Sequence, residues 1–157
     1  MTLVLGIGSI LRGDDGFGVR VAEELRERTL PRDVRVVMAE LRGLAHAEEI
    51  AGAARAIILD AIDAGKPPGT LLVFTPEQVK SLQAEASPHE VSMLGILKLI
   101  GAIGHCPPVT IIGCQRGACL EGEKLSAEVA AAVTRAADMT ERLLDSPPVG
   151  SDKGGAL

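Results

Sequence analysis

The chain has 157 residues, a net charge of −5 at pH 7 and only two aromatic side chains. This length is typical of one domain and buries a core without the help of disulfides or a structural metal. The acidic charge disfavours a nucleic acid as partner, and so few aromatic rings cannot stack on single-stranded bases. No apolar run reaches the roughly 18 residues of a membrane helix, so no membrane partner is expected either.

The opening residues and the cysteines favour a cytoplasmic location. Residues 1–6 lack the basic segment of a secretory signal. The three cysteines form no CxxC motif, and their odd number fits a reducing compartment better than a disulfide framework. A zinc site of His105, Cys106, Cys114 and Cys119 is an alternative, but the gap between the last two is wider than usual in zinc knuckles. We expect Cys114 to pack as a small apolar side chain.

Short apolar runs predict five strands, and segments of helical periodicity separate or follow most of them. The predicted strands cover residues 2–8, 34–39, 56–62, 70–75 and 109–113. The predicted helices cover residues 16–29, 44–54, 87–103 and 126–144. The third helix has the clearest start, because Ser87, Pro88 and Glu90 form a capping box with proline at its favoured position.

Strands that alternate with helices are typical of a parallel sheet covered on both faces. The sequence therefore predicts one three-layer α/β domain over residues 1–145, with a mostly parallel five-stranded sheet and helices on both faces. Residues 146–157 are rich in Pro, Gly and Ser and are predicted to form a flexible C-terminal tail.

The glycine-rich segment after the first strand is open to two interpretations. Gly6 and Gly8 match the first two glycines of a dinucleotide-binding loop, but Leu11 occupies the third position. Asp14 and Asp15 directly precede the helix, where their charges would repel a pyrophosphate. A nucleotide- or phosphate-binding module is therefore the weaker alternative. In a simpler interpretation, one of these aspartates caps the following helix while the other faces the cleft.

Three side chains at the ends of predicted elements form a candidate site. Ligands of parallel sheets bind beyond the carboxyl ends of the strands, where Asp15 follows the first strand and Asp60 ends the third. His89 occupies the first turn of the helix that begins at Ser87, and the helix dipole there favours the neutral, metal-binding imidazole. Two carboxylates and one imidazole suit a divalent metal. Turn or cap roles for the aspartates and a solvated surface role for His89 are the structural alternatives.

Four blocks of the sequence, in this order, resemble the hydrogenase maturation endopeptidases. They are residues 6–18, 59–61, 87–90 and 111–126, and the resemblance covers about residues 1–145. Two segments depart from the family pattern. Ser9 stands where many members carry Asn. After the second strand, many members carry an Asp-Gly-Gly-Thr-like segment where this chain has Met38-Ala39-Glu40-Leu41-Arg42-Gly43, which leaves the subfamily open.

The resemblance implies an aspartyl-type endopeptidase that removes the C-terminal extension of a nickel-loaded hydrogenase large-subunit precursor. In the family, two acidic residues and one histidine can bind the metal, and these correspond to Asp15, Asp60 and His89, which are also the candidate catalytic residues. Nickel is then carried by the substrate and used for recognition. A non-cleaving chaperone that checks metal loading is an alternative function, and a monomer is the favoured oligomeric state.

Overall fold

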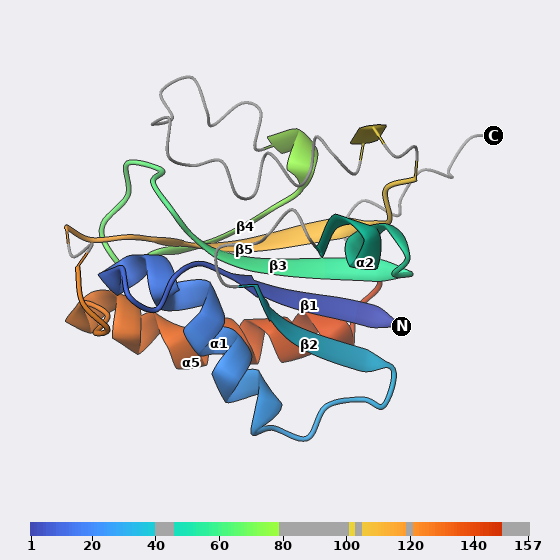
Figure 1. The fold of residues 1–157 in the computed structure, drawn as a ribbon, viewed down its shortest axis with the longest axis horizontal. Helices are drawn as coiled ribbons and strands as arrows, with labels where there is room; N and C mark the ends of the chain where they lie inside the picture. Colours follow the sequence, from blue (N-terminus) through green and yellow to red (C-terminus); the bar gives the residue numbers. More distant parts are fainter. Residues whose placement is uncertain (40–45, 79–100, 103–104, 119–120, 149–157) are drawn as a thin grey trace.

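The computed structural model of the protein describes residues 1–39, 46–78, 101–102, 105–118 and 121–148. The first three strands in these ranges alternate with helices, and the last two strands precede one long helix (Figure 1). In chain order they are β1 (Thr2–Ile7), η1 (Gly13–Gly16), α1 (Phe17–Arg26), β2 (Val34–Ala39), α2 (Ala47–Ala51), β3 (Arg55–Ile62), β4 (Leu71–Phe74), β5 (Val109–Gln115) and α5 (Ala127–Leu144).

The five strands form one mixed sheet in the order β2-β1-β3-β5-β4. All neighbouring pairs are parallel except β4 and β5, which run antiparallel at one edge. The carboxyl ends of β1, β3 and β5 therefore meet at one edge, and α1 and α5 both begin there (Figure 1). The sheet thus brings together segments that lie far apart in the sequence.

Most of the predicted elements are confirmed, with shifted ends. β2 has the predicted bounds, and the other four strands differ from the predictions by one or two residues at an end. The predicted first helix is shorter than expected, because a 3-10 turn, η1, precedes α1. Of the predicted helix over 87–103, only residues 101 and 102 are described, and both are helical. The tail beyond residue 148 lies outside the described residues, so its flexibility stays a prediction.

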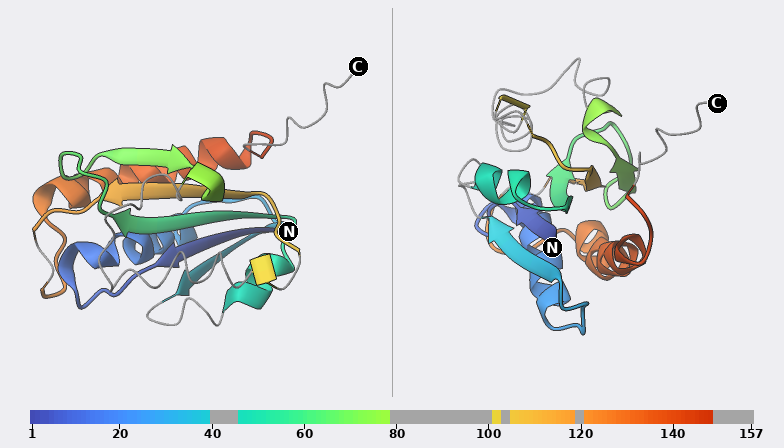
Figure 2. Two further views of the ribbon diagram at one scale, coloured as in Figure 1. Left: turned by 90° about the horizontal axis from the view of Figure 1, so that it is seen from above. Right: turned by 90° about the vertical axis from the view of Figure 1, so that its right-hand side faces the viewer.

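Helices cover both faces of the sheet, as the alternation predicts. One face packs against α1 and α5, and its core contains Phe17, Leu59 and Ile112. The opposite face packs against α2 and contains Ile50 and Ile58. Figure 2 shows α5 and α2 on opposite sides of the strands. Within the described residues, no helix is long and apolar enough to span a membrane.

The start of α1 lies unusually close to the strands beneath it. A Cβ atom on Gly18 would lie 2.2 Å from the Leu59 carbonyl oxygen and 2.5 Å from that of Ile7. A Cβ atom on Gly6, in β1, would lie 2.2 Å from the Gly18 carbonyl oxygen. Only glycine allows this approach of helix backbone to sheet backbone, and it brings the loop before α1 to the carboxyl edge of the sheet.

Candidate functional site

Asp15 lies at the carboxyl edge of the sheet, in the loop that joins β1 to α1. The backbone amide of Ser9, two residues beyond β1, donates a 2.9 Å hydrogen bond to Asp15 Oδ2. The Asp15 amide donates to the Arg12 carbonyl at 3.1 Å. Its side chain is neither fully buried nor fully exposed. One carboxylate oxygen of Asp15 therefore stabilises the loop, and these contacts fix the position of Asp15 beyond the carboxyl end of β1.

Asp60 lies at the same edge of the sheet, near the end of β3. Leu59 is in register with Gly6 of β1, and Asp60 is in register with Gly113 of β5. The Asp60 side chain is 7% exposed and, by strand alternation, belongs to the same sheet face as Ile58. The parallel sheet thus brings two carboxylates that are 45 positions apart, Asp15 and Asp60, to neighbouring strand ends.

His89, the third residue of the predicted site, lies outside the described residues together with its capping box at Ser87 and Glu90. Among the described residues, no group of three His, Cys, Asp or Glu side chains gathers closely enough to hold a metal ion. The grouping of Asp15 and Asp60 with His89 at one metal therefore stays a prediction.

The expectation that Asp14 or Asp15 caps the following helix is wrong. Gly16 is the N-cap of α1, and no side chain makes a capping hydrogen bond there. Asp14 instead reaches across to the start of α5, where it accepts hydrogen bonds from Ser126 and Gly117. This partner lies more than 100 positions away, so the residues next to Asp14 in the sequence give no sign of it.

Gln115, the last residue of β5, also contributes to the carboxyl edge of the sheet, and the sequence did not predict this role. Its buried side chain makes four hydrogen bonds, three of them to the segment that follows Asp60. Oε1 accepts the amides of Ala64 at 2.7 Å and Lys66 at 3.2 Å, and Nε2 donates to Asp63 Oδ1 and to the Arg116 carbonyl. The only sequence signal is a polar residue at the end of an apolar strand.

Asp63 is a structural residue of the turn that follows β3. The hydrogen bond from Gln115 lowers the pKa of the Asp63 carboxyl group, with smaller contributions from the Gly65 amide and the Arg116 guanidinium. Arg116 Nη2 lies 3.7 Å from Asp63 Oδ2. This ion pair and the Gln115 contacts fix the chain just beyond the candidate site.

Gly6 and Gly8 have packing roles that do not require a cofactor. Gly8 has a φ of 137°, and a Cβ atom there would lie 1.8 Å from the Asp15 carbonyl oxygen. Gly6 admits the backbone of α1, as described above. The two glycines that suggested a dinucleotide-binding loop are therefore explained by the close contact between β1, the loop and α1.

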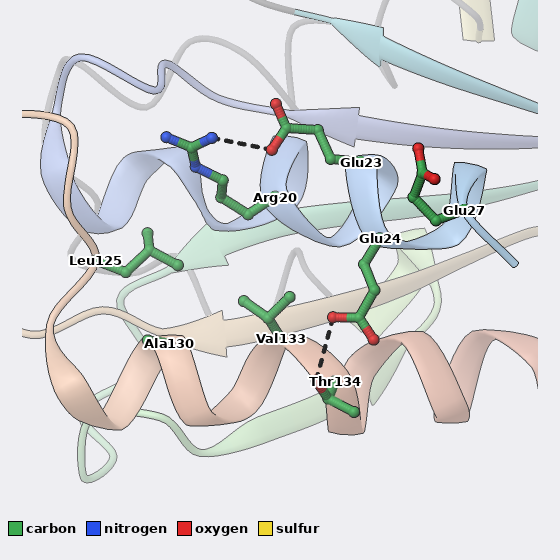
Figure 3. Close-up of a pocket in the computed structure, with 8 residues that line it drawn as sticks. All are labelled: Arg20, Glu23, Glu24, Glu27, Leu125, Ala130, Val133 and Thr134. Carbon is green, nitrogen blue, oxygen red and sulfur yellow. Dashed lines mark hydrogen bonds and ion pairs between the residues drawn. The ribbon is translucent and has the colours of Figure 1, made fainter.

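An open groove of about 640 Å³ lies between α1 and α5 (Figure 3), and neither Asp15 nor Asp60 lines it. Arg20 Nη1 lies 3.0 Å from Glu23, and Thr134 donates to Glu24 at 3.1 Å. A part-exposed ion pair such as Arg20–Glu23 and a hydrogen bond between exposed side chains are typical of a solvated surface. The groove is lined by Arg20, Glu23, Glu24, Glu27, Leu125, Ala130, Val133 and Thr134.

Two of the three cysteines are described, and they differ in environment. Cys114 lies within β5 with no exposed surface, as its predicted packing role requires, whereas Cys106 is exposed. Burial raises the pKa of the Cys114 thiol to about 12. Burial and the charge of Glu77 raise the pKa of Cys106. Because Cys119 lies outside the described residues, the alternative zinc site is not tested.

These environments predict selective thiol modification. In a Cys119→Ser chain at pH 8, a thiol reagent is expected to modify Cys106 within minutes and Cys114 only after unfolding. The Cys114 thiol has no accessible surface, and because burial raises its pKa to about 12, little of the reactive thiolate is present at pH 8. Mass spectrometry with and without denaturant measures the labelling. Rapid modification of Cys114 in the folded chain would contradict its burial.

Comparison of the sequence with models of protein families gives a match over most of the chain. The family model described as "Hydrogenase maturation protease" matches residues 19–143. The chain belongs to the hydrogenase maturation protease family. This finding confirms the resemblance carried by the four sequence blocks.

Individual members of this family are similar to the chain along most of its length. It is 40% identical over 119 residues to the hydrogenase expression/formation protein HoxM of Cupriavidus necator, covering 73% of the chain and 59% of that protein. It is 36% identical over 117 residues to HupD of Rhodobacter capsulatus, covering 72% and 56%. The matched region thus spans little more than half of these two relatives.

Solved structures of the same family share the fold. The hydrogenase maturating endopeptidase HybD from Escherichia coli superposes with a TM-score of 0.82 at 29% identity, over 92% of this chain and 91% of that one. A hydrogenase 2 maturation peptidase from a Thaumarchaeota archaeon gives a TM-score of 0.72 at 35% identity, over 92% and 97%. The α/β architecture of the chain is therefore the architecture of the family.

Proposed function

We propose that the protein is an endopeptidase that removes the C-terminal extension of a nickel-loaded hydrogenase large-subunit precursor. Membership in the hydrogenase maturation protease family is the observation that carries this proposal. The position of Asp15 and Asp60 at neighbouring strand ends supports it, because ligands of such sheets bind at the carboxyl edge.

In this proposal, Asp15, Asp60 and His89 bind the nickel ion that the precursor carries. Asp15 Oδ2 already accepts the Ser9 amide, so Oδ1 is the oxygen we assign to the metal. Carboxylate oxygens and a neutral imidazole together suit a borderline divalent ion. The metal belongs to the substrate, and these side chains distinguish a loaded precursor from an empty one.

The same two carboxylates are our candidates for the hydrolytic chemistry. Hydrolysis of a peptide bond requires a base that accepts a proton from the attacking water, and an ionised carboxylate can accept it. Asp60 is largely shielded from solvent, whereas Asp15 is partly accessible. A water held between the substrate and either carboxylate would be activated without a covalent intermediate.

We propose the cytoplasm as the place of this reaction. An odd number of cysteines with no CxxC motif fits a reducing compartment better than a disulfide framework.

The mass of a co-expressed precursor tests the proposed function. The precursor is expected to become shorter by its C-terminal extension only when this protein and nickel are both present. A precursor that binds the protein but keeps its full mass would indicate a non-cleaving chaperone and would overturn the proposal. Cleavage in the absence of nickel would overturn the recognition role of the metal.

A titration with nucleotides tests the rejected alternative. Because the Asp15 carboxylate stands just before α1 and Gly8 packs against the Asp15 backbone, we expect NAD, NADP, FAD and ATP to bind no tighter than about millimolar. Calorimetry measures the affinity. A micromolar dissociation constant for any of them would restore the nucleotide-binding interpretation.

A further inference from the structure

The Asp14 carboxylate is fully buried and is held by three hydrogen bonds. Its side chain has no exposed surface. The Ser126 amide donates to Oδ1 at 2.7 Å, and the Ser126 hydroxyl and the Gly117 amide donate to Oδ2 at 2.9 and 2.8 Å. A buried carboxylate is stable only when donors of this kind replace its hydration, so the contacts are specific.

These three donors belong to the connection between β5 and α5. Ser126 is the N-cap of α5, yet its own side chain makes no capping hydrogen bond to that helix. The Asp14 carboxylate lies at the positive end of the α5 dipole, where a negative charge is stabilised. Asp14 therefore caps α5 from a distant part of the chain.

The same connection also holds the loop after β1. The Gly13 amide donates to the Gly122 carbonyl at 2.7 Å, and Arg12 forms an isolated parallel bridge with Gly122. The next residue after Asp14 is Asp15, whose carboxylate accepts the Ser9 amide. Asp14 is thus the central contact between the loop that carries a candidate ligand and the start of α5.

We propose that Asp14 is a positioning residue, which fixes Asp15 by anchoring its loop to the start of α5. The effect of Asp14 on precursor processing rests on the proposed function, but its effect on the position of Asp15 does not. Asp14 cannot contact a substrate, because its side chain has no exposed surface. It acts only through the position of Asp15.

The Asp14→Asn variant tests this role with little change in side-chain size. An amide oxygen can still accept the Ser126 amide, but an NH₂ group in place of Oδ2 would face the Gly117 N–H, so donor meets donor. Loss of the hydrogen bond to the carboxylate is expected to raise amide exchange about tenfold or more at Gly117. Exchange at Ser126 is expected to rise less, because a neutral amide oxygen is a weaker acceptor than a carboxylate oxygen.

The decisive measurement is amide exchange at Ser9, whose N–H donates to Asp15. If Asp14 positions Asp15, exchange at Ser9 is also expected to rise about tenfold in the Asp14→Asn variant. If Asp14 only caps α5, exchange rises at Ser126 and stays unchanged at Ser9, which would overturn the proposal. Should Asp14→Asn fail to fold, Ser126→Ala removes one donor and is expected to give a smaller rise at Ser9.

Thr140→Val is the matched control. Thr140 is fully buried in α5 and its hydroxyl donates to the Ala136 carbonyl, so its replacement perturbs the same helix far from Asp14. Exchange at Ser9 is expected to stay unchanged in this variant, and a rise there would overturn the proposal by showing that any damage to α5 reaches Ser9.

If the wild-type chain cleaves the precursor, kcat/KM is expected to fall in Asp14→Asn and to stay unchanged in Thr140→Val. If the wild-type chain does not cleave it, the proposed function fails, and exchange at Ser9 still decides the role of Asp14.

Discussion

An Asp60→Asn chain is expected to fold and yet leave a nickel-loaded large-subunit precursor uncleaved. The amide has nearly the shape of the carboxylate but lacks the charge that binds a divalent cation or accepts a proton from water. Asp60 is 7% exposed, and a neutral side chain costs less to bury than a charged one. We therefore expect the loss to appear in processing rather than in folding.

The size of the effect follows from the assigned role. Removal of one of three metal ligands is expected to weaken recognition of the loaded precursor by one or more factors of ten, each about 1.4 kcal/mol. Loss of a general base is expected to lower the rate of hydrolysis by roughly a further hundredfold or more. The mass of the precursor over time measures processing, and circular dichroism with a melting curve measures folding.

Asp63→Asn is the matched control for Asp60→Asn. Asp63 lies at the same edge of the sheet but is exposed and is bound by Gln115 and Arg116. Asparagine can still accept the Gln115 hydrogen bond through its amide oxygen. Processing is expected to persist in this variant, and equal loss in both would indicate a general effect of charge at this edge. Normal processing by Asp60→Asn would remove Asp60 from the site.

The central strands β1, β3 and β5 could be predicted because each is a short apolar run that is buried along most of its length. β3 and β5 are buried along nearly their whole length, and the sequence shows this as an almost unbroken apolar run. The direction of β4 could not be predicted. An edge strand pairs with one neighbour only, and the turn-rich segment before it allows either direction.

The start of α1 was less predictable than its body. Its apolar face follows helical periodicity, so Val21 and Leu25 are buried as expected. The residues just before Phe17 instead form the 3-10 turn η1, which the Asp14 contacts with α5 and the Gly13 contact with Gly122 hold in place. Contacts made more than 100 positions away override the local pattern.

Part of the candidate site could also be derived from the sequence. The rule that ligands bind at the carboxyl edge selects Asp15 and Asp60, and the structure places both there. The roles of Asp14 and Gln115 could not be derived. Each depends on which distant backbone amides the fold presents to a buried side chain, and periodicity carries no information about that.

Replacement of Gly18 by alanine is expected to destabilise the fold strongly. The new methyl group would lie 2.2 Å from the Leu59 carbonyl oxygen and 2.5 Å from that of Ile7. Both atoms belong to central strands that pair on both sides and cannot move independently. The clash can be relieved only if the start of α1 moves away from the sheet, which opens the packing around Phe17.

The expected cost of Gly18→Ala is about 3 kcal/mol, the upper part of the usual range for an overpacked core. For a chain of this length, that loss corresponds to a fall in melting temperature of roughly 6–12 °C. It is a large share of a typical total stability of about 5–15 kcal/mol. Processing is expected to fall as well, because α1 begins directly after Asp15.

Gly101→Ala provides the control, because a Cβ atom there meets nothing within 4 Å. Gly101 is helical and exposed, so alanine is expected to leave the melting temperature unchanged or to raise stability by up to about 1 kcal/mol. A melting temperature that is unchanged in Gly18→Ala would show that α1 does not approach the strands this closely. The fixed position of Asp15 above β1 depends on that approach, so the same result would also remove the geometric basis of the candidate site.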